Sequence, residues 1–291
     1  MNSNGLFNYM SENSLNSLFR NGKVLTKRDI NGSDAGSLGI NLEKKKMQVL
    51  NARNLIGNKE ISIDKNGFEM IPYNINHLNL DFFNNKEVLD KYYIHCADFI
   101  KDRTGAKNVY AFDHNIRSAS GKKTKKMIKG GQQVQGPAHI VHGDYTLTSA
   151  PERFRQLAKP AGKNDTLRLI LGKSNSLLSQ DCVNETLSNG RFAIINLWRN
   201  IVENPVEINP LALCDASTVS PDDLVVFEIH YTDRIGENYF AKHNKNHEWY
   251  YFNKITKHEA LLIKQWDSHG SIAKSNGKLS DNESLDNPCT F

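Results

Sequence analysis

The sequence predicts a mainly β fold, a sandwich or a barrel, with helices that flank the strands. Two strongly apolar runs of strand length, 192–198 and 224–231, are typical of buried strands. Other short strand-like stretches are separated by turn-prone segments such as 64–67, as in β-sandwiches and barrels. One helix is predicted over 85–104, where apolar residues recur at helical spacing before Gly105. We expect the two apolar runs to be paired strands. The helix is expected to pack outside the sheet through Leu89, Tyr92 and Phe99.

Length and composition are those of an ordinary globular protein. The chain has 291 residues, of which 38% are hydrophobic and 24% charged, and it is long enough to bury a sizeable core. Residues 1–46 are rich in Asn, Ser, Gly and Lys, so we expect a poorly structured N-terminal segment there. Residues 47–291 are expected to form a single domain.

Charge, cysteine content and hydropathy limit the function classes. The formal net charge of +5 is only mildly basic and does not require a nucleic-acid partner. The four cysteines are scattered and match no zinc-binding spacing, which favours a reducing compartment. The sequence shows no apolar run of about 18 residues and no signal-peptide pattern in its first residues. We therefore expect a cytoplasmic protein that binds neither nucleic acid nor membrane.

The strongest local signal for chemistry is His142-x-Asp144, at the end of a strand predicted to begin at Ala138. Residues i and i+2 of a strand point to the same face, so the imidazole and the carboxylate can turn toward one ion. A second histidine from elsewhere would complete the two-histidine-one-carboxylate triad, which leaves open positions on Fe(II). The alternative is a histidine and an aspartate that hydrogen-bond each other in a polar turn.

Other motifs are less specific. His243 and His247 have the i,i+4 spacing that can bind zinc on a helix, but they flank a predicted turn and lack a Glu beside the first His. The glycine motifs of dinucleotide and nucleotide sites and the Gly-x-Ser-x-Gly motif do not occur in the sequence. No side chain is therefore assigned a catalytic role of its own.

Seven segments, ordered along residues 60–270, carry a wider pattern. They are 109–117, 139–153 (HIVHGDYTLTSAPER), 195–199, 210–216, 233–239, 247–252 and 259–268. As an ordered set they resemble the hydroxylase/desaturase family of fungal and bacterial non-haem iron, 2-oxoglutarate-dependent oxygenases. That family includes an aspergillic-acid pathway hydroxylase, a gibberellin desaturase and a cephamycin methoxylation component.

The resemblance implies a double-stranded β-helix (jelly roll) in 47–291, with Fe(II) and 2-oxoglutarate as cofactors. The implied reaction is hydroxylation or desaturation of a small natural product in secondary metabolism. His142 and Asp144 match the family's H-x-D position and are implied to be two metal ligands. Arg199 is a candidate for binding a carboxylate of 2-oxoglutarate, because a guanidinium suits bidentate recognition. Its alternative role is a structural salt bridge.

The sequence departs from the family pattern near its end. The family's distal histidine follows the Gln-Trp-Asp-Ser stretch, which is matched at 265–268, but this chain stops at Phe291 before such a histidine segment. No arginine occurs after Arg234, although a C-terminal arginine commonly binds 2-oxoglutarate in the wider superfamily. We therefore expect a jelly roll without its last strand, C-terminally incomplete, whose third ligand is absent or is supplied by His269.

Two other functions stay open. The chain could be a non-catalytic relative that serves as a binding or heterodimer partner of an active oxygenase, which the missing ligand favours. A small-molecule methyltransferase is the weaker alternative, because the sequence has no glycine-rich cofactor loop. As an oxygenase the chain would act on a small-molecule substrate, and it could form a homodimer or a heterodimer.

Overall fold

The structure is a computed structural model that describes residues 2–30, 34–55, 61–131, 133–162, 165–232, 234–278 and 289. Its contacts divide the chain into two compact units. The first unit comprises Met1–Pro72, His139–Glu152 and Asn189–Phe291, and the second comprises Tyr73–Ala138 and Arg153–Ser188. The division therefore differs from the expected one, a segment 1–46 followed by a single domain 47–291.

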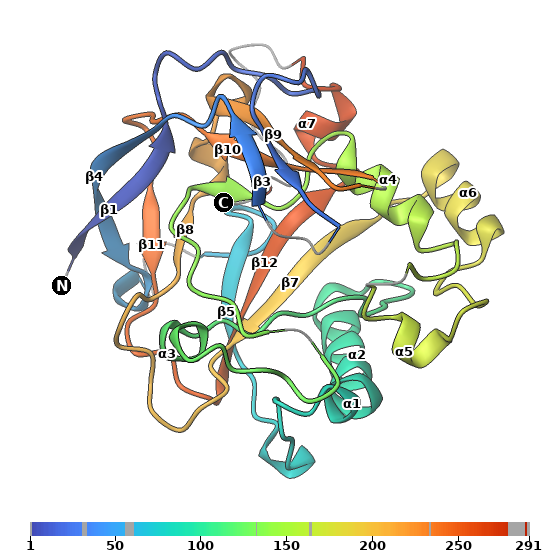
Figure 1. Ribbon diagram of the computed structural model, residues 1–291. Coiled ribbons are helices and arrows are strands. Elements are labelled where there is room, and N and C mark those ends of the chain that lie inside the picture. Colours follow the sequence, from blue (N-terminus) through green and yellow to red (C-terminus); the bar gives the residue numbers. More distant parts are fainter. Residues whose placement is uncertain are drawn as a thin grey trace. The chain divides into compact units, whose positions relative to one another are not determined.

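The first unit holds every strand of the described residues, in three sheets (Figure 1). One sheet has the order β1 (Ser3–Met10), β4 (Leu42–Asn51), β11 (Trp249–Tyr251), β8 (Ala212–Cys214). Another has the order β3 (Asp34–Leu38), β2 (Leu25–Arg28), β9 (Leu224–His230), β10 (Ile235–Ala241), β6 (His142–Gly143). The third, whose strands lie side by side in Figure 1, is β5 (Phe68–Pro72), β12 (Glu259–Asp267), β7 (Ala193–Arg199).

Short helices connect these strands or form the second unit. Those in the first unit are η1 (Ala52–Leu55), η4 (Ala216–Thr218), η5 (Pro221–Asp223) and α7 (Ser271–Lys274). Helix α4 (Ser149–Gln156) begins in the first unit and ends in the second. Those of the second unit are η2 (Asn76–Leu78), α1 (Asn85–Glu87), η3 (Val88–Tyr92), α2 (Tyr93–Thr104), α3 (Ala119–Lys123) and α5 (Arg168–Leu171), with α6 (Gln180–Asn189) at its end.

A buried apolar cluster lies on one face of β12. Leu261 and Ile263 point to this face because side chains alternate along a strand, and both are at most 5% exposed. They pack with Phe68 of β5 and with Tyr250 of β11 in one buried cluster. Burial of side chains this large contributes on the order of 1.5–3 kcal/mol each, so the cluster fixes the position of β12.

The expectation of a poorly structured segment 1–46 is wrong. This stretch contains β1, β2, β3 and the first half of β4, and β1 pairs with β4 antiparallel along its whole length. Tyr9 and Met10 of β1 are fully buried, and Met47 and Val49 alternate with exposed residues along β4. A few buried side chains together with ladder hydrogen bonds hold the segment, although its composition is polar.

The two apolar runs form strands, as predicted, but they are not paired with each other. The run 192–198 contains most of β7, which pairs with β12. The run 224–231 contains β9, which pairs antiparallel with β10 and parallel with β2. An apolar run predicts a buried strand but not its neighbour, because the neighbour is set by connections that the pattern does not encode.

The helix predicted over 85–104 forms as α1, η3 and α2 in direct succession. It ends where Gly105 adopts a left-handed conformation with φ of 68°, a common helix terminus. Leu89 and Tyr92 contribute to the apolar core of the second unit, and the ring of Phe99 lies 4.5 Å from that of Tyr73. The partners found for these three side chains therefore lie within the second unit.

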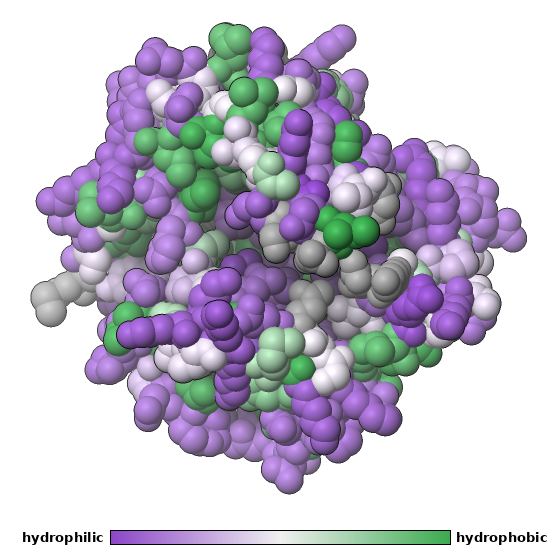
Figure 2. Space-filling view, in the orientation of Figure 1, coloured by the Kyte–Doolittle hydropathy of each residue, from purple (hydrophilic) through white to green (hydrophobic). Residues whose placement is uncertain are grey.

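The face drawn in Figure 2 is mostly hydrophilic, and its hydrophobic side chains form small patches separated by hydrophilic ones. Within the part of the chain that the structure describes, no helix combines the length and the apolar character needed to cross a bilayer.

Candidate metal centre

His142 and Asp144 are brought together at the end of a short strand. β6 pairs with β10, with His142 opposite Phe240 and Gly143 opposite Tyr239. Asp144 is the first residue after β6, and its Oδ1 lies 3.6 Å from Nε2 of His142. The two side chains are 26% and 39% exposed, so a small ion can reach both. The expected proximity of the two groups is thus present in the structure.

The hydrogen bond of His142 determines which ring nitrogen carries the proton. Nδ1 lies 2.7 Å from the carbonyl oxygen of Ile140, which can only accept, so Nδ1 is the donor. In the neutral imidazole Nε2 then has a lone pair directed toward a carboxylate that also only accepts. At 3.6 Å the two atoms are not hydrogen-bonded to each other, which argues against the polar-turn alternative. Two facing acceptors are stabilised by a cation between them.

The donor set fits one metal ion. Imidazole nitrogen and carboxylate oxygen each bind first-row metals at about 2.0–2.2 Å, so two donors on one ion are at most about 4.4 Å apart. The observed 3.6 Å is within this limit, and two neighbouring ligands of a facial triad, about 3 Å apart, require it to shorten by about half an ångström. A neutral imidazole and a carboxylate are also two of the three ligand groups in Fe(II) facial triads.

Asp144 is held through both its main chain and its side chain. Its main-chain N–H donates to Oε1 of Gln265 at 2.9 Å, and its Oδ2 accepts from Nδ2 of Asn196 at 2.9 Å. Oδ2 is therefore engaged by an amide, whereas Oδ1 is the oxygen that faces His142.

Gln265 reaches Asp144 from an irregularity in β12. Lys264 pairs with Ile195 of β7, yet Trp266 pairs with Ile194, so Gln265 is an extra residue in the ladder. Such a β-bulge re-aims side chains and is over-represented beside active sites. Gln265 is 8% exposed, and its contact with Asp144 is part-buried.

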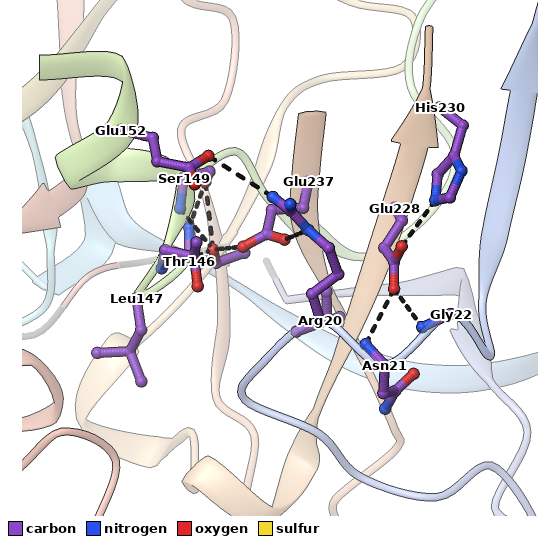
Figure 3. A network of polar contacts seen from close by, with 12 residues as sticks. Arg20, Asn21, Gly22, Thr146, Leu147, Ser149, Glu152, Glu228, His230 and Glu237 are labelled. Carbon is purple, nitrogen blue, oxygen red and sulfur yellow. Dashed lines mark hydrogen bonds and ion pairs between the residues drawn. The ribbon is translucent and has the colours of Figure 1, made fainter. Parts of the chain in front are cut away.

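The loop after Asp144 is fixed by a buried polar network (Figure 3). The hydroxyl of Thr146 donates to Oε1 of Glu237 on β10 and accepts from the N–H of Ser149 at 3.0 Å. The other oxygen of Glu237 accepts from Nε of Arg20 at 2.8 Å. Since Thr146 and the Glu237 side chain are fully buried, this loop cannot move without breaking hydrogen bonds inside the protein.

Figure 3 also shows how the residues that follow Arg20 are attached to β9. Glu228 is 2% exposed and accepts hydrogen bonds from the main chain of Asn21 and Gly22 and from the ring of His230. Burial opposes ionisation of Glu228, but these hydrogen bonds outweigh it and hold the pKa of the carboxyl below its usual value. The segment 20–22 is therefore bound by one carboxylate on β9 and by another on β10.

The other site residues expected from the sequence do not join the pair. The described histidines, cysteines, aspartates and glutamates form no group of three that could hold a metal, so His269 does not complete one. His269 is exposed, and its main-chain N–H donates to Asp267. The guanidinium of Arg199 donates to the carbonyls of Asn200 and Lys257, and strand alternation places Arg199 on the face of β7 opposite Asn196.

The expectation about the end of the chain falls on residues outside the described part, apart from Cys289. Sequence reasoning missed Asn196 and Gln265. Both lie in segments that carry the family resemblance, but neither forms part of a recognisable ligand motif.

Comparison with solved structures identifies the class of fold. The chain is similar to the iron and alpha-ketoglutarate-dependent endoperoxidase NvfI, with a TM-score of 0.69 and 19% identity over 99% of this chain and 88% of that one. The match confirms the predicted double-stranded β-helix.

Comparison of sequences identifies the family. The family model described as "Oxidoreductase/YMDC permease-like domain" matches residues 7–288, and the chain belongs to this family. A protein of Methylophilus leisingeri, described as "Uncharacterized protein in dcmA 3'region", is 42% identical over 67% of this chain and 88% of its own length. The hydroxylase/desaturase efuI of Hormonema carpetanum is 24% identical over 87% of this chain and 86% of its own length. The predicted resemblance to hydroxylase/desaturase proteins is thereby confirmed.

Proposed function

We propose that the protein is an Fe(II)- and 2-oxoglutarate-dependent oxygenase that hydroxylates or desaturates a small natural product in secondary metabolism. The observation that carries the proposal is the pair of facing acceptors, Nε2 of His142 and Oδ1 of Asp144, 3.6 Å apart in a jelly roll. Relatives named as a hydroxylase/desaturase and as an iron and alpha-ketoglutarate-dependent endoperoxidase support it.

In this proposal His142 and Asp144 hold the iron. Bound Fe(II), with 2-oxoglutarate and oxygen, supplies the oxidising chemistry, whereas the protein supplies ligands and orientation. In the neutral imidazole, the hydrogen bond from Nδ1 of His142 to the Ile140 carbonyl leaves the lone pair on Nε2, the nitrogen that faces Asp144. Binding of 2-oxoglutarate by Arg199 stays a prediction, since its guanidinium already contacts two main-chain carbonyls.

The proposal also places the enzyme in the cytoplasm. None of the four cysteines, all of which are described, forms a disulfide, in keeping with a reducing compartment. Assembly into a homodimer or a heterodimer is kept as part of the same proposal.

The test compares metal binding and 2-oxoglutarate turnover in three variants. His142→Ala and Asp144→Ala each remove one donor, whereas His139→Ala removes an exposed imidazole three residues away. We expect the wild type and His139→Ala to bind Co²⁺ and to form succinate from 2-oxoglutarate when Fe(II) is present. The other two variants should lose both properties. Equal Co²⁺ binding by all four proteins, or turnover that survives Asp144→Ala, would refute the proposal.

A further inference from the structure

Asp144 is held by two amide side chains from neighbouring strands, one at its carboxylate and one at its main-chain N–H. Asn196 on β7 donates to Oδ2, and Gln265 on β12 accepts from the main-chain N–H. Each contact is 2.9 Å long, which is a normal hydrogen-bond length. The main-chain contact fixes where Asp144 lies, and the side-chain contact fixes how its carboxylate is turned.

The two amides meet at Asp144 because Asn196 projects from β7 and Gln265 is the extra residue of the bulge in the adjacent strand β12. Asn196 pairs with Ile263, and Ile194 pairs with Trp266, so all four side chains share one face. Between Ile263 and Trp266 a regular strand would have one residue, but β12 has Lys264 and Gln265. The extra residue is therefore inserted where the strand passes Asp144.

We propose that Gln265 and Asn196 are positioning residues of the metal centre, which leave Oδ1 of Asp144 as the single oxygen directed at the ion. This inference rests on the proposed function, because it requires a metal at His142 and Asp144. Neither amide is a metal ligand here, because Asn196 contacts Oδ2 and Gln265 contacts the main chain. Partners of this kind orient a ligand before the metal binds, so their loss weakens metal affinity.

The roles of the two amides differ in one testable respect. Gln265 has to supply an acceptor, and a glutamate of the same length would also supply one. Asn196 has to supply a donor, and leucine of similar size supplies none. Gln265→Glu should therefore keep the function of Gln265, whereas Gln265→Met and Asn196→Leu should lose their respective contacts.

The experiment measures Co²⁺ affinity and the visible absorption of bound Co²⁺ in the full chain, with thermal unfolding in parallel. We expect Gln265→Met and Asn196→Leu each to lower Co²⁺ affinity about 10–100-fold and to change the Co²⁺ spectrum. Gln265→Glu should bind Co²⁺ nearly as well as the wild type. Gln48→Met, the same change on the exposed side of β4, is the matched control and should leave affinity and spectrum unchanged.

The outcomes separate the inference from the proposed function. If the wild type and His142→Ala bind Co²⁺ equally, both the proposed function and this inference are overturned. If His142→Ala abolishes binding but Gln265→Met and Asn196→Leu bind like the wild type, only the positioning role is overturned. Equal weakening by Gln265→Glu and Gln265→Met would also overturn it, since an acceptor at this position would then be irrelevant. A loss of affinity without a matching fall in unfolding temperature would support it against a merely structural role.

Discussion

The hydroxyl of Thr146 donates a hydrogen bond to the carboxylate of Glu237, and both side chains are buried. Thr146→Val removes the donor and leaves a buried charged acceptor with one partner fewer. We expect the free energy of unfolding to fall by about 1–3 kcal/mol, the cost of an unsatisfied buried polar group. Urea unfolding measures the loss. Thr104→Val, at the exposed end of α2, is the control, and an equal loss there would contradict the prediction.

Acid should destabilise the protein partly through Asp223. Burial opposes ionisation of this carboxyl, but hydrogen bonds from His247, Ser220 and Asn244 outweigh it and lower its pKa. A lowered pKa contributes stability that is present above the unfolded value, about 3.9, and is lost as the pH falls through the folded value. We therefore expect the stability difference between the wild type and Asp223→Asn to shrink as the pH is lowered from about 6 to about 3.

The pH series uses chemical unfolding at each pH, with Asp222→Asn as the control. Asp222 is exposed and adjacent in sequence, so its removal should change stability little at any pH. A difference for Asp223→Asn that stays constant with pH would mean that its carboxylate does not titrate differently in the folded and unfolded states.

Removal of the Asp267 carboxylate should lower the free energy of unfolding more than removal of the ammonium group of its partner Lys264. Asp267 is 1% exposed and accepts two hydrogen bonds from Arg191, and Nζ of Lys264 lies 3.4 Å from its Oδ2. Asp267→Leu leaves Lys264, itself 2% exposed, with the exposed Asp64 at 3.6 Å as its one ion-pair partner among the residues that the structure describes. We expect a loss of about 3–5 kcal/mol, because a buried charge is left without its main partner.

Lys264→Met should lower the free energy of unfolding less, because Asp267 keeps both hydrogen bonds from Arg191. The comparison is made by urea unfolding of the two variants at neutral pH. The order of the two losses is the decisive result, and a larger loss for Lys264→Met would show that the lysine, not the aspartate, is the centre of the cluster.

Metal binding should stabilise the folded protein. A ligand that binds only the folded state at about 100 times its dissociation constant adds about 2.7 kcal/mol. We expect Mn²⁺, a redox-stable substitute for Fe(II), to raise the unfolding temperature of the wild type and a chelator to reverse the rise. His142→Ala should show no metal-dependent rise; an undiminished rise would place the bound ion elsewhere in the protein.

Parts of the fold could be predicted from sequence because their signals are local. The helix over 85–104 has helical periodicity and ends at Gly105, and the runs that contain β7 and β9 are apolar enough to predict strands. Strand pairing was predicted wrongly, because it depends on contacts between distant segments. The strands in 1–46 were missed because polar composition conceals a few deeply buried residues such as Tyr9.

The site also combines a contact that local sequence predicts with contacts between distant segments. His142 and Asp144 lie two residues apart, so their proximity could be predicted from strand geometry. Gln265 lies 121 residues after Asp144, and its contact depends on a one-residue shift in the ladder between β12 and β7. Nothing in the apolar pattern of 259–268 indicates that shift, so the partner of Asp144 could be identified only in the structure.

The extra residue in β12 also affects how this fold can change through insertion and deletion. A one-residue deletion within a strand normally exchanges its two faces and exposes the core. Deletion of Gln265 would instead give Ile263 and Trp266 the ordinary two-residue spacing opposite Asn196 and Ile194, with every other side chain on its present face. A single codon could therefore remove or restore an anchor of Asp144 without rearranging the interior. Related chains could thus diverge in metal affinity through an event that leaves their folding almost untouched.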